Sequence, residues 1–281
     1  MGILYLVATP IGNLEDVTLR ALRILGEVPL IAAEDTRTLR KLLTRHRVPT
    51  PNLVSYTDRS RRSRTPKILE ALSRGDVALV SEAGMPAISD PGVHLVEAAV
   101  AAGHRVEPVP GASAVTAALA VSGLPTRRFH YLGFLPRVAG DRRRLLSAVA
   151  NETDTLLVFE APHRLRAALV DIQRLLRDRR VAVCRELTKL HEEVFRGTVS
   201  EALGYFAQPR GEFTLVIEGA GKSKPEPDID VDDLLRDLRR QGLRARDAVK
   251  EAAQRSSLPR KDVYRRWLAL EKAATGRSSV S

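Results

Sequence analysis

The sequence has almost no cysteine and few aromatic residues. Cys184 is the single cysteine of 281 residues, so no disulfide framework can form, which fits a reducing cytoplasm. The histidines share no metal-ligand spacing with one another or with Cys184, so we expect no metal site. No apolar run approaches the roughly 20 residues of a membrane span, and residues 3–7 are typical of a strand rather than of a secretion signal. We therefore expect no membrane association.

What the sequence does contain is a large apolar fraction and an excess of arginine. Hydrophobic residues make up 44% of the chain, and its length exceeds what one small core needs, so two domains are expected. The formal net charge is +11, carried mostly by arginine. A basic surface attracts polyanions, which favours a nucleic acid partner. A coding bias that replaces lysine by arginine is the alternative explanation.

The first half alternates short apolar runs with helical segments. The runs cover residues 3–7, 30–33, 53–55, 77–80 and 105–109, with helices expected over 17–25, 38–46, 66–73, 93–102 and 115–121. This alternation predicts a parallel sheet in an α/β fold. Three of the strands end in loops rich in proline and glycine, at residues 8–14, 81–92 and 110–114. Because such loops meet at one edge of a sheet, we expect them to form a composite ligand pocket.

The second half predicts another α/β domain followed by a helical tail. Strands are expected over residues 129–134, 155–159, 181–184, 193–197 and 211–219, helices over 165–176 and 199–206, and an arginine-rich loop over 136–144. Residues 224–228 have the composition of a linker. Beyond them, residues 231–274 predict about three basic helices, and residues 257–267 resemble the second helix of a helix-turn-helix-like unit. A solvated amphipathic bundle is the alternative, and we favour contact with nucleic acid for the segment as a whole. The expected domains are 1–122 and 123–223, joined through a linker at 224–230 to a basic RNA-binding tail at 231–281.

Carboxylates recur where the predicted strands end. They are Glu34, Asp35, Glu82, Asp90, Glu160 and Glu186. Acidic groups beside proline and glycine loops suit a ligand with hydroxyls and a cationic centre, such as S-adenosylmethionine with its ribose, ammonium and sulfonium. Each carboxylate could equally cap a helix or form an ion pair. We expect Asp16 to cap the helix over 17–25 and Asp90, directly before a proline, a glycine and a helix, to cap the helix over 93–102.

Seven sequence blocks occur in an order that resembles a known family. They are residues 9–14 (TPIGNL), 33–37 (AEDTR), 81–92 (SEAGMPAISDPG), 110–113 (PGAS), 133–136 (GFLP), 160–164 (EAPHR) and 185–189 (RELTK). Together with the tail they resemble the bacterial 16S ribosomal RNA cytidine 2′-O-methyltransferases of the tetrapyrrole methylase superfamily. That family usually has Ser-Asp-Ala-Gly-Thr-Pro at the central loop, where this chain has Glu82 and Met85.

The resemblance implies two αβα domains with S-adenosylmethionine in the cleft between them, a small C-terminal helical domain, and a homodimer. It implies a cytoplasmic enzyme that methylates the ribose of a decoding-centre cytidine in the 30S subunit. The cofactor pocket would be lined by Pro10, Gly84, Met85, Pro86, Ile88, Ser113, Ala114 and Phe159, with Leu215 and its neighbours closing it. The candidates for activating the 2′-hydroxyl, all at strand mouths, are Glu34, Asp35, Glu160, Glu186 and Lys189.

The resemblance also gives the arginine-rich segments a role in RNA binding. We expect Arg59, Arg61, Arg62, Arg137, Arg142, Arg143 and Arg144, on loops flanking the pocket, together with Arg37, to hold phosphates. Two alternatives stay open: methylation of a tetrapyrrole or another small molecule by the same fold, and a non-catalytic RNA-binding or ribosome-assembly protein.

Overall fold

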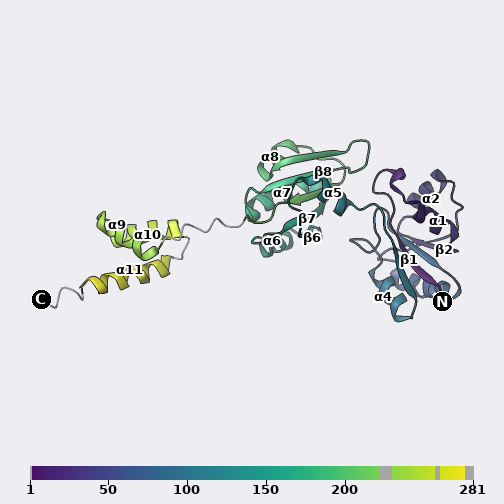
Figure 1. Ribbon diagram of the computed structural model, residues 1–281, viewed down its shortest axis with the longest axis horizontal. Coiled ribbons are helices and arrows are strands. Elements are labelled where there is room, and N and C mark those ends of the chain that lie inside the picture. The colour runs from purple at the N-terminus through teal and green to yellow at the C-terminus, as the bar shows by residue number, and fades with distance from the viewer. Residues whose placement is uncertain (1, 222–229, 257–259, 276–281) are drawn as a thin grey trace. The chain divides into compact units, whose positions relative to one another are not determined.

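The computed structural model describes residues 2–221, 230–256 and 260–275. The chain divides into two compact units, Met1–Ala220 and Gly221–Ser281. The larger unit contains two five-stranded sheets, each covered by helices, and the smaller unit contains three helices (Figure 1).

The first sheet is entirely parallel, as the alternating pattern predicts. Its strands are β1 (Ile3–Val7), β2 (Leu30–Ala33), β3 (Asn52–Ser55), β4 (Val77–Val80) and β5 (Arg105–Val109), in the order β3-β2-β4-β1-β5. All four residues of β4 are buried. A strand covered by helices on both faces needs such an uninterrupted apolar run, so β4 lies at the centre of the sheet.

Two pairs of helices cover the two faces of the first sheet. Helices α1 (Leu19–Glu27) and α2 (Thr36–Arg45) pack on one face, and α3 (Arg61–Arg74) and α4 (Val93–Ala101) pack on the other. The expected cap at Asp16 is wrong, because Asp16 lies in a short turn η1 (Leu14–Asp16), and Thr18 accepts the capping bond from the amide of Ala21 at 3.1 Å. Helix α3 also begins earlier than predicted, so Arg61 and Arg62 lie in its first turn and not in a loop.

The second sheet is mixed. Its strands are β6 (Phe129–Phe134), β7 (Thr155–Glu160), β8 (Arg180–Arg185), β9 (Glu193–Thr198) and β10 (Phe213–Ile217), in the order β6-β7-β10-β8-β9. Strands β6 and β7 are parallel, and the other neighbours are antiparallel. Strand β10, buried at all five residues, lies in the middle of this sheet.

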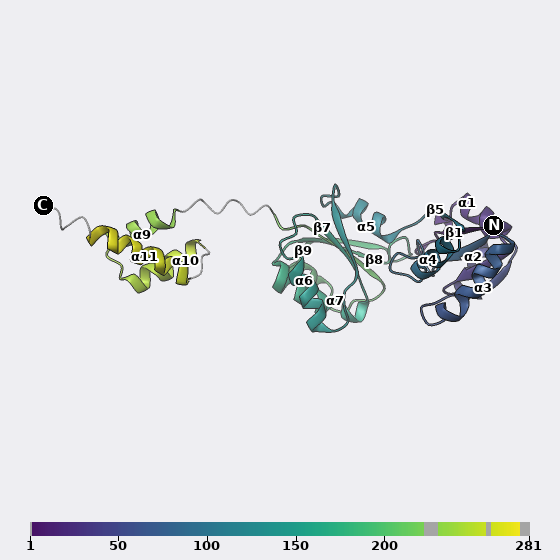
Figure 2. The ribbon, with the colours of Figure 1, turned by 90° about the horizontal axis from the view of Figure 1, so that it is seen from below.

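Helices α6 (Ala139–Ala148), α7 (Pro162–Leu176) and α8 (Val199–Tyr205) cover one face of the second sheet, and α5 (Ala114–Ser122) covers the other (Figure 2). The expected loop over 136–144 is therefore wrong over most of its length, because α6 begins at Ala139 and buries Leu146 completely. Burying a leucine side chain contributes roughly 1.5–3 kcal/mol, which outweighs the low hydrophobicity of the segment. Because α5 packs on the second sheet, a domain boundary at 122/123 assigns this helix to the wrong sheet.

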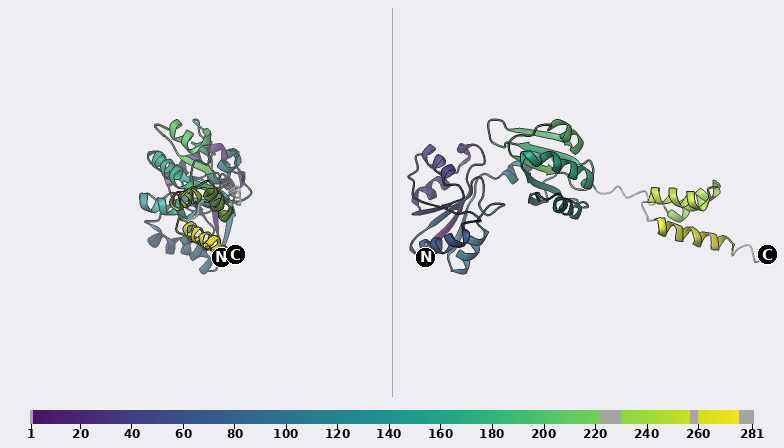
Figure 3. Two further views of the ribbon diagram at one scale, coloured as in Figure 1. Left: turned by 90° about the vertical axis from the view of Figure 1, so that its left-hand side faces the viewer. Right: turned by 180° about the vertical axis from the view of Figure 1, so that it is seen from behind.

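The smaller unit is a three-helix bundle, as the tail sequence predicts. It consists of α9 (Val231–Arg240), α10 (Ala245–Ser256) and α11 (Arg260–Thr275), drawn in yellow-green in Figure 3. Leu235, Ala248, Val263 and Trp267 form its core. Residues 222–229, most of the expected linker, and the expected turn at 257–259 lie outside the described residues. Among the helices that the structure describes, none has the length and apolarity to cross a membrane.

Candidate active site

A cavity of about 710 Å³ lies between the loops of the first sheet and the end of the second sheet. Its walls come from residues 10–12, 14, 34, 38, 82–85, 88–90 and 113–115 on one side, and from 134, 159–163, 184, 187, 189 and 212–214 on the other. The volume is within the range of small-molecule sites in proteins. All three proline and glycine loops border it, which confirms the predicted composite pocket.

The three loops of the first sheet support one another directly. Thr9 and Gly84 exchange two backbone hydrogen bonds, of 2.9 and 3.0 Å, so the loops after β1 and β4 form a short antiparallel bridge. A Cβ atom on Gly111 would lie 3.0 Å from the Cβ of Ala8, so the loop after β5 approaches the first loop closely. The floor of the cavity is therefore backbone, held by contacts that a larger residue at Gly111 would disturb.

The loop after β8 closes the cavity from the second sheet. The backbone amide of Asn13 donates to Thr188 Oγ1 at 3.1 Å. A Cβ atom on Gly12 would lie 2.5 Å from the Lys189 side chain and 2.8 Å from the carbonyl oxygen of Leu187, so only glycine fits there. Thr188 has a φ of 66°, in the left-handed region that residues with a Cβ seldom adopt. Such strain is concentrated at functional sites.

Two carboxylates in the cavity carry raised pKa values. Burial raises the pKa of Asp90 from 3.8 to about 6, the charges of Glu34 and Glu82 add to the rise, and a hydrogen bond from the Ser81 hydroxyl opposes it. Burial also raises the pKa of Glu34, although the amide of Glu82 donates to its Oε2 at 3.3 Å. Three carboxylates, of Glu34, Glu82 and Asp90, thus lie together on the first-sheet side of the cavity, which suits a ligand with a positive charge.

Aromatic side chains form the opposite wall. Phe159 packs edge-on against Tyr131 and Phe134, with ring centroids 5.3 and 5.4 Å apart. Phe134 lines the cavity and is 56% exposed, so its ring offers a free face at the mouth. The hydroxyls of Tyr131 and Ser89 are hydrogen-bonded at 2.5 Å, which ties the loop after β4 to β6.

The candidates for activating a hydroxyl separate into two groups. Glu34, Glu160 and Lys189 line the cavity, whereas Asp35 does not line it and caps α2 by accepting from the amide of Arg37 at 2.7 Å. That bond lowers the pKa of Asp35. The Glu160 side chain is fully buried against Arg164, with Nε and Oε1 3.0 Å apart, which contradicts a role in proton transfer.

Glu186 and Lys189 form an ion pair at the rim of the cavity. Lys189 Nζ lies 3.0 Å from Glu186 Oε1 and 2.8 Å from Glu212 Oε2. The backbone amide of Glu212 also donates to Glu186 at 2.8 Å and, with Lys189, lowers the pKa of Glu186. Burial works against the charge of Lys189, but its bonds to Glu212 and Glu186 raise its pKa. The pair fixes the strained loop, and Glu186 is a poor proton acceptor.

The cavity includes most of the residues predicted to bind the cofactor. Pro10, Gly84, Met85, Ile88, Ser113, Ala114 and Phe159 line it. Pro86 is buried and is not among the lining residues, and the neighbours Phe213 and Thr214 reach the cavity where Leu215 was expected. Leu215 is fully buried in the sheet core, on the face of β10 that α6, α7 and α8 cover.

The arginines predicted to bind phosphate do not share one environment. Arg37, Arg59, Arg62, Arg137 and Arg144 are exposed. Arg61 lies 3.7 Å from Asp58, and Arg143 pairs with Asp171 at 2.8 Å. Arg142 is 6% exposed and pairs with Asp171 at 2.6 Å, so a phosphate contact by Arg142 is wrong. A buried ion pair of this kind holds α6 against α7.

The prediction that Asp90 caps α4 is also wrong. Gly92 occupies the N-cap position of α4, and no side chain caps this end. Asp90 instead lines the cavity, as does His163, a residue of the 160–164 block for which the sequence predicts no role. The proline that follows Asp90 suggests a helix start from sequence alone, and only the coordinates show that the chain turns once more before α4 begins.

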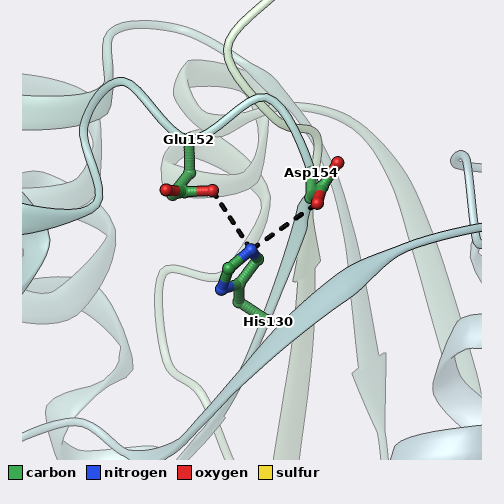
Figure 4. A group of neighbouring side chains, drawn as sticks. All are labelled: His130, Glu152 and Asp154. Atoms are coloured by element: carbon green, nitrogen blue, oxygen red, sulfur yellow. Dashed lines mark ion pairs between the residues drawn. The ribbon is translucent and has the colours of Figure 1, made fainter.

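A second group of titratable side chains lies at the opposite ends of β6 and β7. His130 Nε2 is 3.1 Å from Glu152 and 3.6 Å from Asp154 (Figure 4). His130 lies on β6 and the two carboxylates precede β7, so no local sequence motif predicts this group. Asp154 also accepts from Arg128 Nε at 3.1 Å. Because the Arg128 guanidinium already pairs with Asp154, we interpret this group as a structural cluster that stabilises the start of β7.

Comparison with known proteins identifies the family. A sequence profile of the tetrapyrrole (corrin/porphyrin) methylases matches residues 3–203, and a profile of the RsmI C-terminal HTH domain matches residues 225–271. The ribosomal RNA small subunit methyltransferase I of Synechocystis sp. is 48% identical over 277 residues, 96% of this chain and 99% of the relative. The chain belongs to the ribosomal RNA small subunit methyltransferase I family, within the tetrapyrrole methylases.

Other members of this methyltransferase I family are similarly close. The protein of that name from Thermotoga maritima is 50% identical over 222 residues, 78% of this chain and 99% of its own length. Among solved structures, the uroporphyrin-III C-methyltransferase of Thermus thermophilus in complex with S-adenosylhomocysteine matches with a TM-score of 0.57 and 22% identity, over 77% of this chain and 97% of that one. The methyltransferase CobJ matches with a TM-score of 0.61 and 19% identity, over 78% and 95%. These likenesses confirm the predicted fold.

Proposed function

We propose that the protein transfers a methyl group from S-adenosylmethionine to the 2′-oxygen of a cytidine ribose in 16S ribosomal RNA, at position 1402 of the decoding centre. The observation that carries the proposal is the cavity, which joins a carboxylate wall to an aromatic wall in a chain whose relatives are named small subunit methyltransferases. The ribose position rests on the seven sequence blocks. The proposal includes a homodimer that acts on the 30S subunit in the cytoplasm.

The residues of the cavity fit S-adenosylmethionine. Glu34 and Glu82 offer carboxylates for its cationic groups, and Ile88, Phe159 and Leu187 offer apolar surface for its adenine. The three loops pack closely through backbone contacts and carry few long side chains. Their backbone N–H and C=O groups can therefore approach the cofactor directly. When bound, the cofactor supplies an electrophilic methyl group on a sulfonium. The protein then has to hold the ribose oxygen in line with the methyl carbon and the sulfur.

The mouth of the cavity suits an unstacked nucleotide. Proteins read single-stranded RNA by stacking its bases on exposed aromatic rings. Phe134 has such a ring, fixed from behind by Phe159. Exposed arginines, including Arg37 and Arg62, lie on the elements that follow β2 and β3. We assign Phe134 to the target base and these arginines to phosphates.

The tail gives the proposal a second RNA contact. Its three helices carry basic side chains on their exposed surface, and α11 exposes Lys261, Tyr264 and Arg265 in its first two turns. Arginine, lysine and tyrosine together suit an RNA backbone with a stacked base. We therefore assign the RsmI C-terminal HTH match to substrate binding.

The test is a transfer assay with three acceptors. Labelled S-adenosylmethionine is incubated with 30S subunits, with protein-free 16S RNA and with uroporphyrinogen, and the labelled nucleoside is identified by nuclease digestion and mass spectrometry. We expect 2′-O-methylcytidine from the ribosomal acceptor. Label on a base or on the porphyrinogen overturns the proposal, and absence of transfer to all three favours a non-catalytic RNA-binding protein.

A matched pair of variants tests the assignment of Phe134. Phe134→Ala removes the stacking ring, and Val138→Ala removes an equally exposed apolar side chain that does not line the cavity. We expect only the first to raise the KM for RNA, with the Kd for S-adenosylmethionine unchanged in both. Equal effects of the two variants contradict the assignment.

A further inference from the structure

The loop that carries Asp90 is held in a strained conformation. Ala87 and Ser89 have φ values of 69° and 63°, and Gly92 has a φ of 153°. A Cβ atom on Gly92 would lie 3.0 Å from the Leu79 side chain and 3.1 Å from Ala87, so the loop folds back tightly against the end of β4. Non-glycine residues in the left-handed region are energetically unfavourable and persist where the surroundings enforce them. This strain fixes the position of the Asp90 carboxylate.

The neighbouring residue anchors the loop to the second sheet. Ser89 and Tyr131 share a hydrogen bond of 2.5 Å, and a Cβ atom on Gly133 would lie 3.2 Å from Ser89 Oγ. Strand β6 ends at Phe134, the ring assigned above to the target base. Asp90 therefore lies in the cavity wall next to the anchor that joins both sheets.

The surroundings of Asp90 give it no structural partner of opposite charge. In the described part of the chain, Asp90 forms no ion pair with lysine or arginine, and no side chain caps α4. The charged and titratable groups that face Asp90 are Glu34 after β2, Glu82 after β4 and Tyr131 on β6, and Ser81 donates a hydrogen bond to it. A carboxylate in such surroundings destabilises the fold, and carboxylates of this kind are concentrated at functional sites.

Three other acidic side chains at or near the cavity have structural partners. Glu160 is paired with buried Arg164, Glu186 is paired with Lys189, and Asp35 caps α2 outside the cavity. Glu34 accepts a backbone hydrogen bond from Glu82. Asp90 and Glu34 are thus the carboxylates of this set without a cationic partner, and Asp90 is the one that lies directly beside the Ser89–Tyr131 anchor.

We propose that Asp90 accepts the proton of the acceptor 2′-hydroxyl, an inference that rests on the function proposed above. The ribose oxygen forms its new bond to the methyl carbon with a lone pair, while the electrons of the carbon–sulfur bond remain on sulfur. The electrons of the O–H bond stay on the oxygen, and the proton passes to a carboxylate oxygen of Asp90. The products are a methyl ether, a neutral thioether and a protonated Asp90, which releases its proton to solvent.

The surroundings suit this task. With a pKa of about 6, Asp90 is ionised at neutral pH and is still a stronger base than an exposed aspartate. General-base catalysis by a positioned side chain contributes roughly 10²–10⁴-fold to a rate. Asp90→Asn keeps the shape of the side chain and removes the base, so kcat should fall within that range.

The matched control is Glu97→Gln. Glu97 is exposed on α4, seven residues along the chain, and it does not line the cavity. We expect kcat of the wild type and of Glu97→Gln to fall tenfold per pH unit below about pH 6, measured in single turnovers at saturating RNA and cofactor. Asp90→Asn should show a low rate without this pH dependence, and Asp90→Glu should regain part of it.

Binding measurements separate proton transfer from cofactor binding. Calorimetry with S-adenosylmethionine, which is cationic at sulfur, and with S-adenosylhomocysteine, which is neutral there, should give Kd values for Asp90→Asn within threefold of the wild type. A selective loss of S-adenosylmethionine affinity, with kcat retained at saturation, overturns the proposal because Asp90 would then bind the sulfonium. A kcat within threefold of the wild type, or a wild-type rate that is flat between pH 5 and 8, also overturns it.

The wild-type product distinguishes this failure from a failure of the proposed function. If nucleoside mapping finds 2′-O-methylcytidine and Asp90→Asn is fully active, the function stands and the base assignment fails. If mapping finds methyl on a base, the proposed function fails before the variant is considered. Thermal unfolding of each variant shows that a low rate is not caused by misfolding.

Discussion

Replacing Asp90 by asparagine should stabilise the protein while it removes activity. The pKa of Asp90 is raised from 3.8 to about 6, so the folded state holds the proton more tightly than the unfolded chain. The shift corresponds to about 3 kcal/mol at most, at 1.36 kcal/mol per pKa unit. Asp90 is only partly buried, and solvent screening reduces the effect to roughly 1 kcal/mol. Asparagine has no charge to desolvate and also relieves the repulsion of Glu34.

The sign of the pH dependence makes this prediction specific. The stabilising contribution of protonated Asp90 in the wild type is fully present below about pH 4 and is lost as the pH rises through about 6. Asp90→Asn has no ionisable group at this position and therefore shows no such loss. The variant should therefore gain nothing at pH 3.5 and roughly 2–4 °C in Tm at pH 8, measured by calorimetry of the main transition. Glu97→Gln, measured at each pH, gives the background. A variant that is less stable than the wild type at pH 8 refutes the reasoning about the buried carboxylate.

Three further predictions follow from the arginines and the aromatic wall. Arg142→Ala should lower the free energy of unfolding by about 1.5–3 kcal/mol, because Asp171 loses its buried partner and keeps only the more exposed Arg143, whereas Arg144→Ala should leave it unchanged; urea denaturation compares the two. Arg62→Ala should weaken RNA binding for all sequences and reduce the slope of log K against log salt by about 1, measured by filter binding from 50 to 300 mM salt. Tyr131→Phe should leave Tm within about 2 °C and raise the KM for RNA, because it breaks the bond to Ser89 that positions the loop; an unchanged KM would contradict that role.

Much of the fold can be predicted from local sequence. Strands such as β4 and β10 are short apolar runs bounded by glycine or charged residues, so their burial follows from composition. Helix α6 could not be predicted in this way, because its arginines resemble those of a polar loop. The helix buries Arg142 and Leu146, and the partner of Arg142, Asp171, lies 29 residues later, where a local pattern does not reveal it.

The site could be predicted in outline and not in its chemistry. The positions of prolines and glycines predict which loops meet, because backbone requirements are local. Which carboxylate remains available depends on partners distant in sequence: Arg164 occupies Glu160, and Lys189 with Glu212 occupies Glu186. Asp90 differs from them in the side chains that surround it, and these are determined by the tertiary structure and not by the local sequence.

Helix α5 has a consequence for where the chain can be divided. It packs on the second sheet, while the residues just before it, at 110–113, contact the loops of the first. A break after Ser122 would leave α5 in the amino-terminal fragment without the second sheet on which it packs. The apolar face of α5 would then be exposed to solvent, which favours aggregation. A break near Gly111 would leave each fragment with the helices of its own sheet, at the expense of the loop that both need to close around a ligand. The two halves of this enzyme are therefore difficult to exchange as independent modules in evolution or in design.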